Sequence, residues 1–387
     1  MNVFETDKKY VANTYKRFPV EIVSGKGSIA LSADGKEYID MGSGIGVTSF
    51  GIADEKWQAA IIDQISKVQH MSNLYYTSPS IKLAELLCEK TGMKKVFFSN
   101  SGGEANECAI KTARKYAAEK KGEDFYTIVT LINSFHGRTI TTLAATGQEH
   151  YHELFRPLTP GFIHVSADSP EELRRVCEKE KVAAVMIECV QGEGGVVPIP
   201  QAFADELSAI AKEKDILIIV DEVQSGNGRT GKLYSYMNYG LRPDIVSTAK
   251  GLAGGLPIGA TLFSEKTADV LEPGTHGSTF GGNPVSCAAA LSILKRIDDK
   301  LLAEVREKGE YVFSELKDAP GVKSISGLGL MIGVETEKPA SEVVQKCLEK
   351  GVLCLTAKNK IRLLPALNID FEVLKRAVKI IKAACAE

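Results

Sequence analysis

Apolar and polar positions follow a regular order through the middle of the chain. Between residues 82 and 263, short apolar runs such as KKVFF, FYTIVTLI and AAVMIE are separated by longer amphipathic stretches such as EANECAIKTARKYAAEKK and ADELSAIAKEKD. The short runs predict buried strands, and the longer stretches predict helices. This βαβ order predicts a mostly parallel sheet with helices on both faces. Because ligands bind such sheets beyond the carboxyl ends of the strands, candidate chemistry is expected just after each apolar run.

The two ends of the chain have a different pattern. Residues 20–41, VEIVSGKGSIALSADGKEYIDM, alternate apolar and polar positions around an Asp-Gly turn, which is typical of an antiparallel hairpin. The C-terminal part combines helical stretches with short strands such as GLGLMIGVE and KIRLLPAL. We therefore predict an α/β fold with a large domain over residues 51–284 and a smaller α+β domain built from residues 1–50 and 285–387.

Composition and charge exclude several classes of protein. The chain has 387 residues, 44% of them hydrophobic, and its 47 Lys and Arg nearly balance its 49 Asp and Glu. This balance gives no long-range attraction for a polyanion, so no nucleic-acid partner is expected. The charged N-terminal segment MNVFETDKKYVANTYKRF lacks the apolar stretch of a secretory signal, and no window reaches the length of a membrane span. We expect no membrane partner and a cytoplasmic location.

Cysteines and histidines show no spacing typical of a metal site. The eight cysteines form no CxxC pair, and several lie inside apolar runs such as VMIECV, so we interpret them as core residues. The six histidines, among them His70 and His136, also lack ligand spacing. No metal is expected.

The apolar run ILIIV is followed by an acid, Asp221, where a strand should open toward a ligand. A buried carboxylate at such a strand end needs a cationic partner, although it could also simply cap the next turn. A P-loop nucleoside triphosphatase would use a similar acid to hold Mg²⁺. The pattern of its phosphate-binding loop, G-x-x-x-x-G-K, occurs at Gly226–Lys232. However, Leu233 stands where that loop needs a hydroxyl residue, and the loop follows the acidic strand directly instead of opening an earlier βα unit. The triphosphatase interpretation therefore fails.

A second buried run, DIVSTA, ends at Lys250 and a glycine-rich turn. Loss of hydration disfavours the ammonium form of such a lysine and makes it a nucleophilic amine. Lys250 follows Asp221 by 29 residues, enough for one turn, one helix and one strand, so both can lie at the same sheet edge. Chemistry with pyridoxal phosphate requires at least two groups: an acid that keeps the ring nitrogen protonated and a nearby amine that forms a Schiff base.

A phosphate group would need a separate binding site, and the segment SNSGGEANE offers one. Ser101, Gly102 and Gly103 lie between the strand KKVFF and a long helical stretch. The unpaired N–H groups and the positive dipole end of a helix N-terminus bind phosphate well. A Ser-Gly-Gly helix start is more often a simple cap, and its position after the strand is what favours a phosphate site.

Ordered segments along nearly the whole chain resemble the class III (ω-amino acid) aminotransferases, which are fold type I pyridoxal phosphate enzymes. The segments include DGKEYIDMGSGIGV, SNSGGEANE, SFHGRT, IECVQGEGG, VDEVQSGNGRTGK, STAKGLAGGLPIGA, STFGGNP and IRLLPAL. The resemblance implies that fold, pyridoxal 5'-phosphate as cofactor, and a homodimer with a shared active site. It also implies transfer of the terminal amine of an N²-acylated ornithine to 2-oxoglutarate, giving glutamate, in arginine biosynthesis.

The resemblance assigns roles around the cofactor ring. Lys250 is implied as the lysine bonded to the cofactor, Asp221 as the partner of the ring nitrogen, and Gln224 as a donor to the ring hydroxyl. Phe135 and Val223 would lie on the two faces of the ring.

The resemblance also implies that the cofactor phosphate is held from two subunits. Ser101, Gly102 and Gly103 would bind it from one chain, and Thr279 would reach it from the neighbouring chain. We expect Ser278, in the same HGSTFGGNP segment, to contact the substrate.

Two arginines are implied to bind substrate carboxylates, although each could instead form a surface salt bridge. Arg138, in FHGRT, would pair with the carboxylate at the far end of the substrate, and Arg362, in KIRLLPAL, would bind the α-carboxylate of 2-oxoglutarate or glutamate. Glu193, in QGEGG, would cover Arg362 when the amine donor has no carboxylate at that place. Glu188 and Tyr76 are further candidates for lining this pocket.

The preferred amine donor stays open at the level of sequence. Ornithine, succinylornithine and 4-aminobutyrate would use the same arginines as an acetylated ornithine. The segment TSFGIADEKW departs from the Gly-His-x-His-Pro-like turn usual in the family, and Gly103 replaces the commoner Thr or Ala. An alternative from another class is a module that binds a ligand on the same sheet without catalysis.

Overall fold

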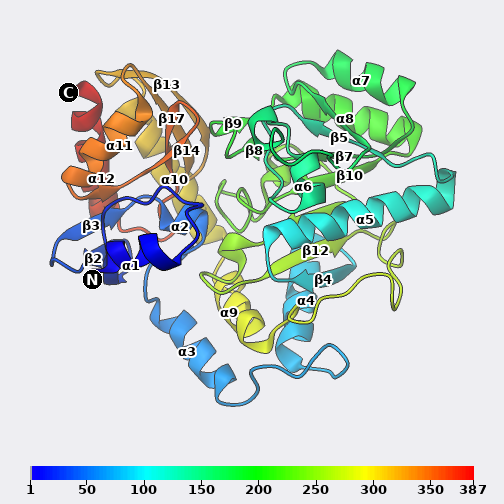
Figure 1. Ribbon diagram of the computed structural model, residues 1–387, viewed down its shortest axis with the longest axis horizontal. Coiled ribbons are helices and arrows are strands. Elements are labelled where there is room, and N and C mark those ends of the chain that lie inside the picture. Colours follow the sequence, from blue (N-terminus) through cyan, green and yellow to red (C-terminus); the bar gives the residue numbers. More distant parts are fainter. Residues whose placement is uncertain (1) are drawn as a thin grey trace.

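A seven-stranded sheet forms the centre of the computed structural model, which describes residues 2–387 (Figure 1). In spatial order its strands are β4 (Lys95–Ser99), β12 (Gly259–Phe263), β11 (Ile245–Thr248), β10 (Leu217–Asp221), β7 (Val182–Ile187), β5 (Thr127–Leu131) and β6 (Phe162–Val165). All neighbours pair in parallel except at β12, which is antiparallel to both β11 and β4. The predicted α/β fold with a mostly parallel sheet is confirmed.

Helices cover both faces of this sheet because its strands are apolar on both sides. On one face, α5 (Gly102–Lys121) contributes small buried residues such as Cys108 and Ala113, which pack on Met186 of β7. The next residue, Ile187, points to the opposite core. That core is closed by α4 (Ser78–Thr91), α7 (Pro170–Lys179), α8 (Gln201–Lys214) and α9 (Pro284–Leu294). Seven of the eight cysteines are buried, as expected of core residues.

The two chain ends form two smaller sheets that lie side by side (Figure 1). One contains β1 (Ile22–Lys26), β2 (Ile29–Ser32), β3 (Glu37–Asp40) and β15 (Val352–Leu353), and the other contains β13 (Val322–Leu328), β14 (Met331–Thr336), β17 (Lys360–Leu363) and β16 (Leu355–Ala357). The predicted N-terminal hairpin is present as the antiparallel pairs β1–β2 and β2–β3. C-terminal β15 pairs in parallel with N-terminal β3.

A common core joins these end segments. Ile39 and Met41 pack with buried residues of α10 (Asp299–Leu316), α11 (Ala340–Glu349) and α12 (Phe371–Ala386). The proposed boundaries at residues 50 and 284 stay a prediction.

Short elements complete the chain. They are α1 (Val3–Tyr10), α2 (Ser43–Gly46), α3 (Glu55–Ile65), α6 (Ile140–Ala145), β8 (Val190–Gln191), β9 (Val197–Pro198) and the 3₁₀ turns η1 (Glu149–Tyr151), η2 (Ser235–Asn238) and η3 (Lys250–Leu252). Across residues 2–387, none of the helices combines the length and the apolar character that crossing a bilayer requires.

Candidate functional site

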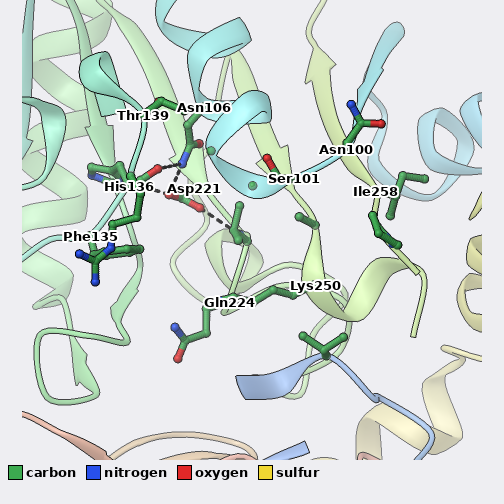
Figure 2. Close-up of a pocket in the computed structure, with 18 of the residues that line it drawn as sticks. Asn100, Ser101, Asn106, Phe135, His136, Thr139, Asp221, Gln224, Lys250 and Ile258 are labelled. Carbon is green, nitrogen blue, oxygen red and sulfur yellow. Dashed lines mark hydrogen bonds and ion pairs between the residues drawn. The ribbon is translucent and has the colours of Figure 1, made fainter. Parts of the chain in front are cut away.

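A cavity of about 730 Å³ opens where five strands of the large sheet end (Figure 2). Most of the residues that line it lie at or after the ends of β4, β5, β7, β10 and β11, so the cavity lies at the carboxyl edge, where the strand pattern predicted a ligand site. The predicted residues that line it are Ser101, Gly102, Gly103, Phe135, Arg138, Glu188, Asp221, Val223, Gln224 and Lys250.

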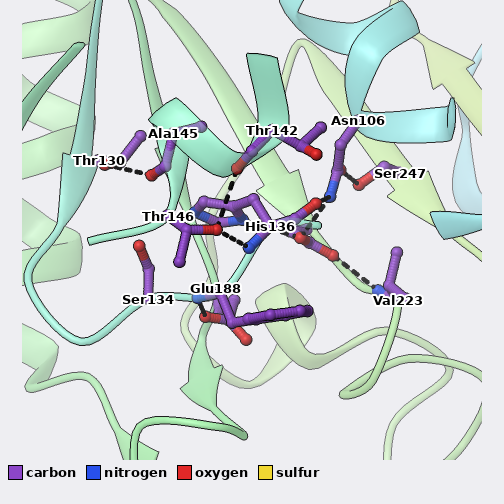
Figure 3. Close-up of polar contacts among 12 residues, drawn as sticks. Asn106, Thr130, Ser134, His136, Thr142, Ala145, Thr146, Glu188, Val223 and Ser247 are labelled. Carbon is purple, nitrogen blue, oxygen red and sulfur yellow. Dashed lines mark hydrogen bonds and ion pairs between the residues drawn. The ribbon is translucent and has the colours of Figure 1, made fainter. Parts of the chain in front are cut away.

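Asp221 ends β10 and is held by three hydrogen-bonding groups (Figures 2 and 3). Its Oδ2 accepts a bond from Asn106 Nδ2 at 2.7 Å and lies 2.8 Å from Nδ1 of His136. Its Oδ1 accepts the main-chain N–H of Val223 at 3.0 Å. Because a carboxylate only accepts, the contact with His136 requires a proton on Nδ1. Asp221 is only 3% exposed, so its direction is fixed by these partners.

Lys250 begins the 3₁₀ turn directly after β11, with the left-handed φ of 44°. A residue with a side chain pays a conformational cost there, which the surrounding structure must offset. Burial lowers the pKa of the Lys250 amine, while the charges of Glu193, Asp221 and Glu188 oppose that change. An amine with a lowered pKa can attack a carbonyl carbon, which is the role that the sequence predicts for Lys250.

The segment predicted to cradle a phosphate group is the start of α5, and it lines the cavity. Ser101 is the N-cap, and its Oγ accepts the N–H of Glu104 at 3.2 Å. Glycine is needed at position 102 because a Cβ there would lie 2.5 Å from Val223 Cγ1. At Gly103 a Cβ would meet nothing closer than 3.9 Å, so an anion has room to approach the N–H groups. This cradle, the buried amine of Lys250 and the acid Asp221 fit pyridoxal phosphate.

Glu193 and Arg362 form an ion pair beside the cavity. Arg362, on β17, is 3% exposed, and its guanidinium binds Glu193 and also donates to Gln224 Oε1 at 3.1 Å. Gln224 Nε2 donates to Glu193 at 3.4 Å and closes a three-residue cluster. Burial would raise the pKa of the Glu193 carboxyl, but the charge and hydrogen bond of Arg362 outweigh it and lower that pKa. Within residues 2–387, Arg362 Nε is buried without a partner, which leaves a free donor.

Glu188 provides a second carboxyl group in the cavity wall. It accepts the main-chain N–H of Phe135 at 2.9 Å. Burial and the neighbouring charge of Asp221 raise the pKa of Glu188 well above its usual range. Both effects act against the charged form of the Glu188 carboxyl group.

Arg138 lies at the exposed rim and contacts aromatic rings instead of acids. Its guanidinium carbon is 4.3 Å from the ring centre of Tyr151 and 5.4 Å from that of Phe135. The Tyr151 ring meets Phe135 edge-on, with centres 5.7 Å apart. This stacking leaves the N–H edge of Arg138 open for a carboxylate.

Glu193 and Arg362 are not among the residues that line the cavity, and neither are three other predicted residues. Ser278 and Thr279 line a separate hollow of about 400 Å³, where Ser278 Oγ accepts a hydrogen bond from Asn100 at 3.1 Å. Tyr76 is 96% exposed, and it does not line the cavity. Across residues 2–387, no cluster of His, Cys, Asp and Glu has the geometry to hold a metal ion.

Sequence reasoning missed Asn106 and Tyr151. Asn106 lies inside the helix that follows the cradle, and no local pattern points to its partner 115 positions away. Tyr151 lies in QEHYHE, a polar segment without a strand end or glycine turn.

Comparisons with known proteins agree with this geometry. The family model "Aminotransferase class-III" matches residues 10–385. The acetylornithine aminotransferase of Haemophilus ducreyi is 49% identical over 99% of this chain and 98% of its own, and that of Aquifex aeolicus is 44% identical over 96% and 99%.

Solved structures show the same fold. The ornithine aminotransferase of Toxoplasma gondii, crystallised with partial occupancy of pyridoxal phosphate, matches with a TM-score of 0.94 and 33% identity, over 99% of this chain and 93% of its own. The acetylornithine aminotransferase of Elizabethkingia anophelis matches with a TM-score of 0.88 and 32% identity, over 98% and 97%.

Proposed function

We propose that this chain, which belongs to the class-III aminotransferase family, moves the terminal amino group of N²-acetylornithine to 2-oxoglutarate. The products are the semialdehyde and glutamate, and the reaction serves arginine biosynthesis. Relatives named as acetylornithine aminotransferases, at 49% and 44% identity over nearly the full length, support this donor. Membership of this family argues against the alternative that the protein binds a ligand without catalysis.

The ion pair between Glu193 and Arg362 is the observation that carries the proposal. 2-Oxoglutarate has a carboxylate beside its reacting carbon, whereas acetylornithine reacts at a terminal amine with no such group. An arginine that binds the first substrate would be a buried unpaired charge with the second. Glu193 supplies the missing negative charge, so one cavity can accept both substrates in turn.

Each remaining residue has a proposed place around the cofactor. Pyridoxal phosphate, when bound, supplies a ring that accepts electrons during transfer of the amine. Its phosphate would be held by Ser101, Gly102 and Gly103. Phe135 and Val223 would enclose the ring.

Proton movement is proposed to depend on two side chains. Asp221 would face the ring nitrogen with its carboxylate and hold a proton there. The Nζ of Lys250, once free, would take the proton from the reacting carbon of the substrate and return it, and the burial that lowers the pKa of this amine favours the neutral form that such a step needs.

We further propose a cytoplasmic homodimer with a shared active site. Thr279 is exposed and lies outside the cavity of its own chain, which supports a role toward a neighbouring subunit. Leu74, Tyr76 and Phe280 are 88%, 96% and 60% exposed, and large apolar side chains at such positions favour burial against a second copy.

The test of the donor is a set of steady-state specificity constants with 2-oxoglutarate as acceptor. We expect kcat/KM to be highest for N²-acetylornithine, and lower for N²-succinylornithine, ornithine and 4-aminobutyrate. The control is Lys250→Ala, which should abolish turnover with every donor. A higher kcat/KM for ornithine or 4-aminobutyrate would overturn the assigned donor while leaving the reaction class intact.

A further inference from the structure

Every polar atom of the Asn106 side-chain amide, which lies in the cavity wall, has a hydrogen-bond partner (Figure 3). Asn106 lies on α5 and is 1% exposed. Its Nδ2 donates to Asp221 Oδ2 and to the main-chain oxygen of His136, each at 2.7 Å. Its Oδ1 accepts the hydroxyl of Ser247 at 2.5 Å. Both donor hydrogens of the amide and one of its acceptor sites are therefore used.

These partners allow only one orientation of the amide. If the amide were reversed, its oxygen would face a carboxylate and a carbonyl oxygen, which both only accept. Ser247 fixes the other end, because it lies on β11 directly beside Asp221 of β10 in the parallel register. The sheet therefore holds the donor and the acceptor of Asn106 at a set spacing.

The hydrogen bonds divide unequally between the two oxygens of Asp221. Oδ2 is bound by Asn106 and by His136, whereas Oδ1 is bound only by the N–H of Val223. A carboxylate oxygen can accept about two hydrogen bonds. The remaining acceptor site of Asp221 is thus on Oδ1, and Asp221 lines the cavity.

We infer that Asn106 is a positioning residue that turns Asp221 so that Oδ1 accepts the N–H of the cofactor ring. This inference rests on the proposed role of Asp221 toward that ring. Without Asn106, Oδ2 keeps only His136, and the carboxylate can rotate about its Cβ–Cγ bond. In this role Asn106 affects only the contact between Asp221 and the ring nitrogen, and it does not affect binding of the phosphate.

The test compares two ligands of the apoprotein: pyridoxal phosphate, and an analogue in which a carbon atom replaces the ring nitrogen. The analogue has no ring N–H to donate, so the ratio of the two affinities isolates the contact with Asp221. We expect the wild-type protein to prefer pyridoxal phosphate. In Asn106→Leu this preference should fall by roughly tenfold, the worth of one hydrogen bond to a charged group, while the affinity for the analogue stays the same.

Two further variants separate positioning from general damage. Ser247→Ala frees the amide oxygen of Asn106 and should lower the preference by roughly threefold, since one modest hydrogen bond is lost. Thr112→Val removes another buried hydroxyl on the same helix, bonded at 2.8 Å to the oxygen of Cys108, and should leave the preference unchanged. If Asn106→Leu does not fold, Ser247→Ala decides the question alone.

The outcomes distinguish this inference from the proposed function. Equal weakening of the binding of both ligands in Asn106→Leu would overturn the positioning role and leave the role of Asp221 standing. An unchanged preference in folded Asn106→Leu or in Ser247→Ala would do the same. A wild-type protein that binds both ligands equally would overturn the role of Asp221 itself, and the inference with it.

Discussion

Replacing Glu193 by Gln removes the negative charge that covers Arg362 and keeps nearly the same shape. In the wild-type structure Arg362 is 3% exposed, and Glu193 is its only acidic partner among residues 2–387. The amide of a glutamine can still accept a hydrogen bond from Arg362, so the variant tests charge and not packing. We expect it to slow the half-reaction of acetylornithine and not that of glutamate.

The size of the effect follows from the contact that is lost. A hydrogen bond to a charged group is worth about 1.5–3 kcal/mol, which corresponds to roughly 10- to 150-fold in a rate or equilibrium constant. In the reaction of acetylornithine, Arg362 would lose this compensation, and the rate should fall by up to that factor. In the reaction of glutamate, the substrate carboxylate no longer has to displace Glu193, so the rate should rise or stay the same.

The assay is a single-turnover measurement of each half-reaction, followed by the visible absorption of the bound cofactor. Glu315→Gln is a matched control, because it breaks the ion pair between Glu315 and Lys382. Neither of these residues lines the cavity. Arg362→Ala should impair the reaction of 2-oxoglutarate far more than that of acetylornithine. Equal slowing of both half-reactions in Glu193→Gln would refute the reasoning and identify the pair as a structural link between β17 and the turn that joins β8 to β9.

Four other outcomes are expected. Because the pKa of Glu193 is lowered from 4.5 in the folded state, its pair with Arg362 stabilises the fold fully above that value and less as the pH falls through the lowered one; melting temperatures of wild type and Glu193→Gln should therefore converge in strong acid. Asp221→Asn should still bind the cofactor, but its single-turnover rate should drop at least tenfold; a near-normal rate would make the carboxylate merely structural. Tyr151→Ala should raise KM for 2-oxoglutarate roughly two- to fivefold through loss of the stacking on Arg138, with kcat little changed and Tyr151→Phe near normal, since such contacts are worth roughly 0.5–1 kcal/mol. Cofactor should stabilise a dimer in sedimentation through Thr279, and an active monomer would exclude the shared site.

The strand pattern was enough to predict the sheet edge at which the cavity opens. Asp221 and Lys250 each follow an apolar run, and parallel strands bring their carboxyl ends to one edge, so both could be placed without a structure. The antiparallel strand β12 was not predicted, although a signal existed. Only residues 249–258 separate β11 from β12, and a parallel connection needs a dozen residues or more.

Contacts between distant segments could not be predicted from local patterns. Asn106 meets Asp221 from 115 positions away, and Arg362 meets Glu193 from 169 positions away. Neither separation along the sequence corresponds to a helix or strand period, because each contact depends on how whole elements pack. The pair of Arg362 and Glu193 was expected only through the family resemblance, and Asn106 was not expected at all.

The parallel pairing of β3 with β15 has a consequence for the order in which the protein folds during synthesis. Ile39 pairs with Val352, so β3 leaves the ribosome about 300 residues before its neighbour exists. At 5–20 residues per second, that delay is on the order of 15 to 60 seconds. Every strand of the large sheet is complete by residue 263, within this interval. The apolar side chains of β2 and β3 that pack on the C-terminal segment, such as Ala30 and Ile39, therefore stay without that cover until the last residues are made.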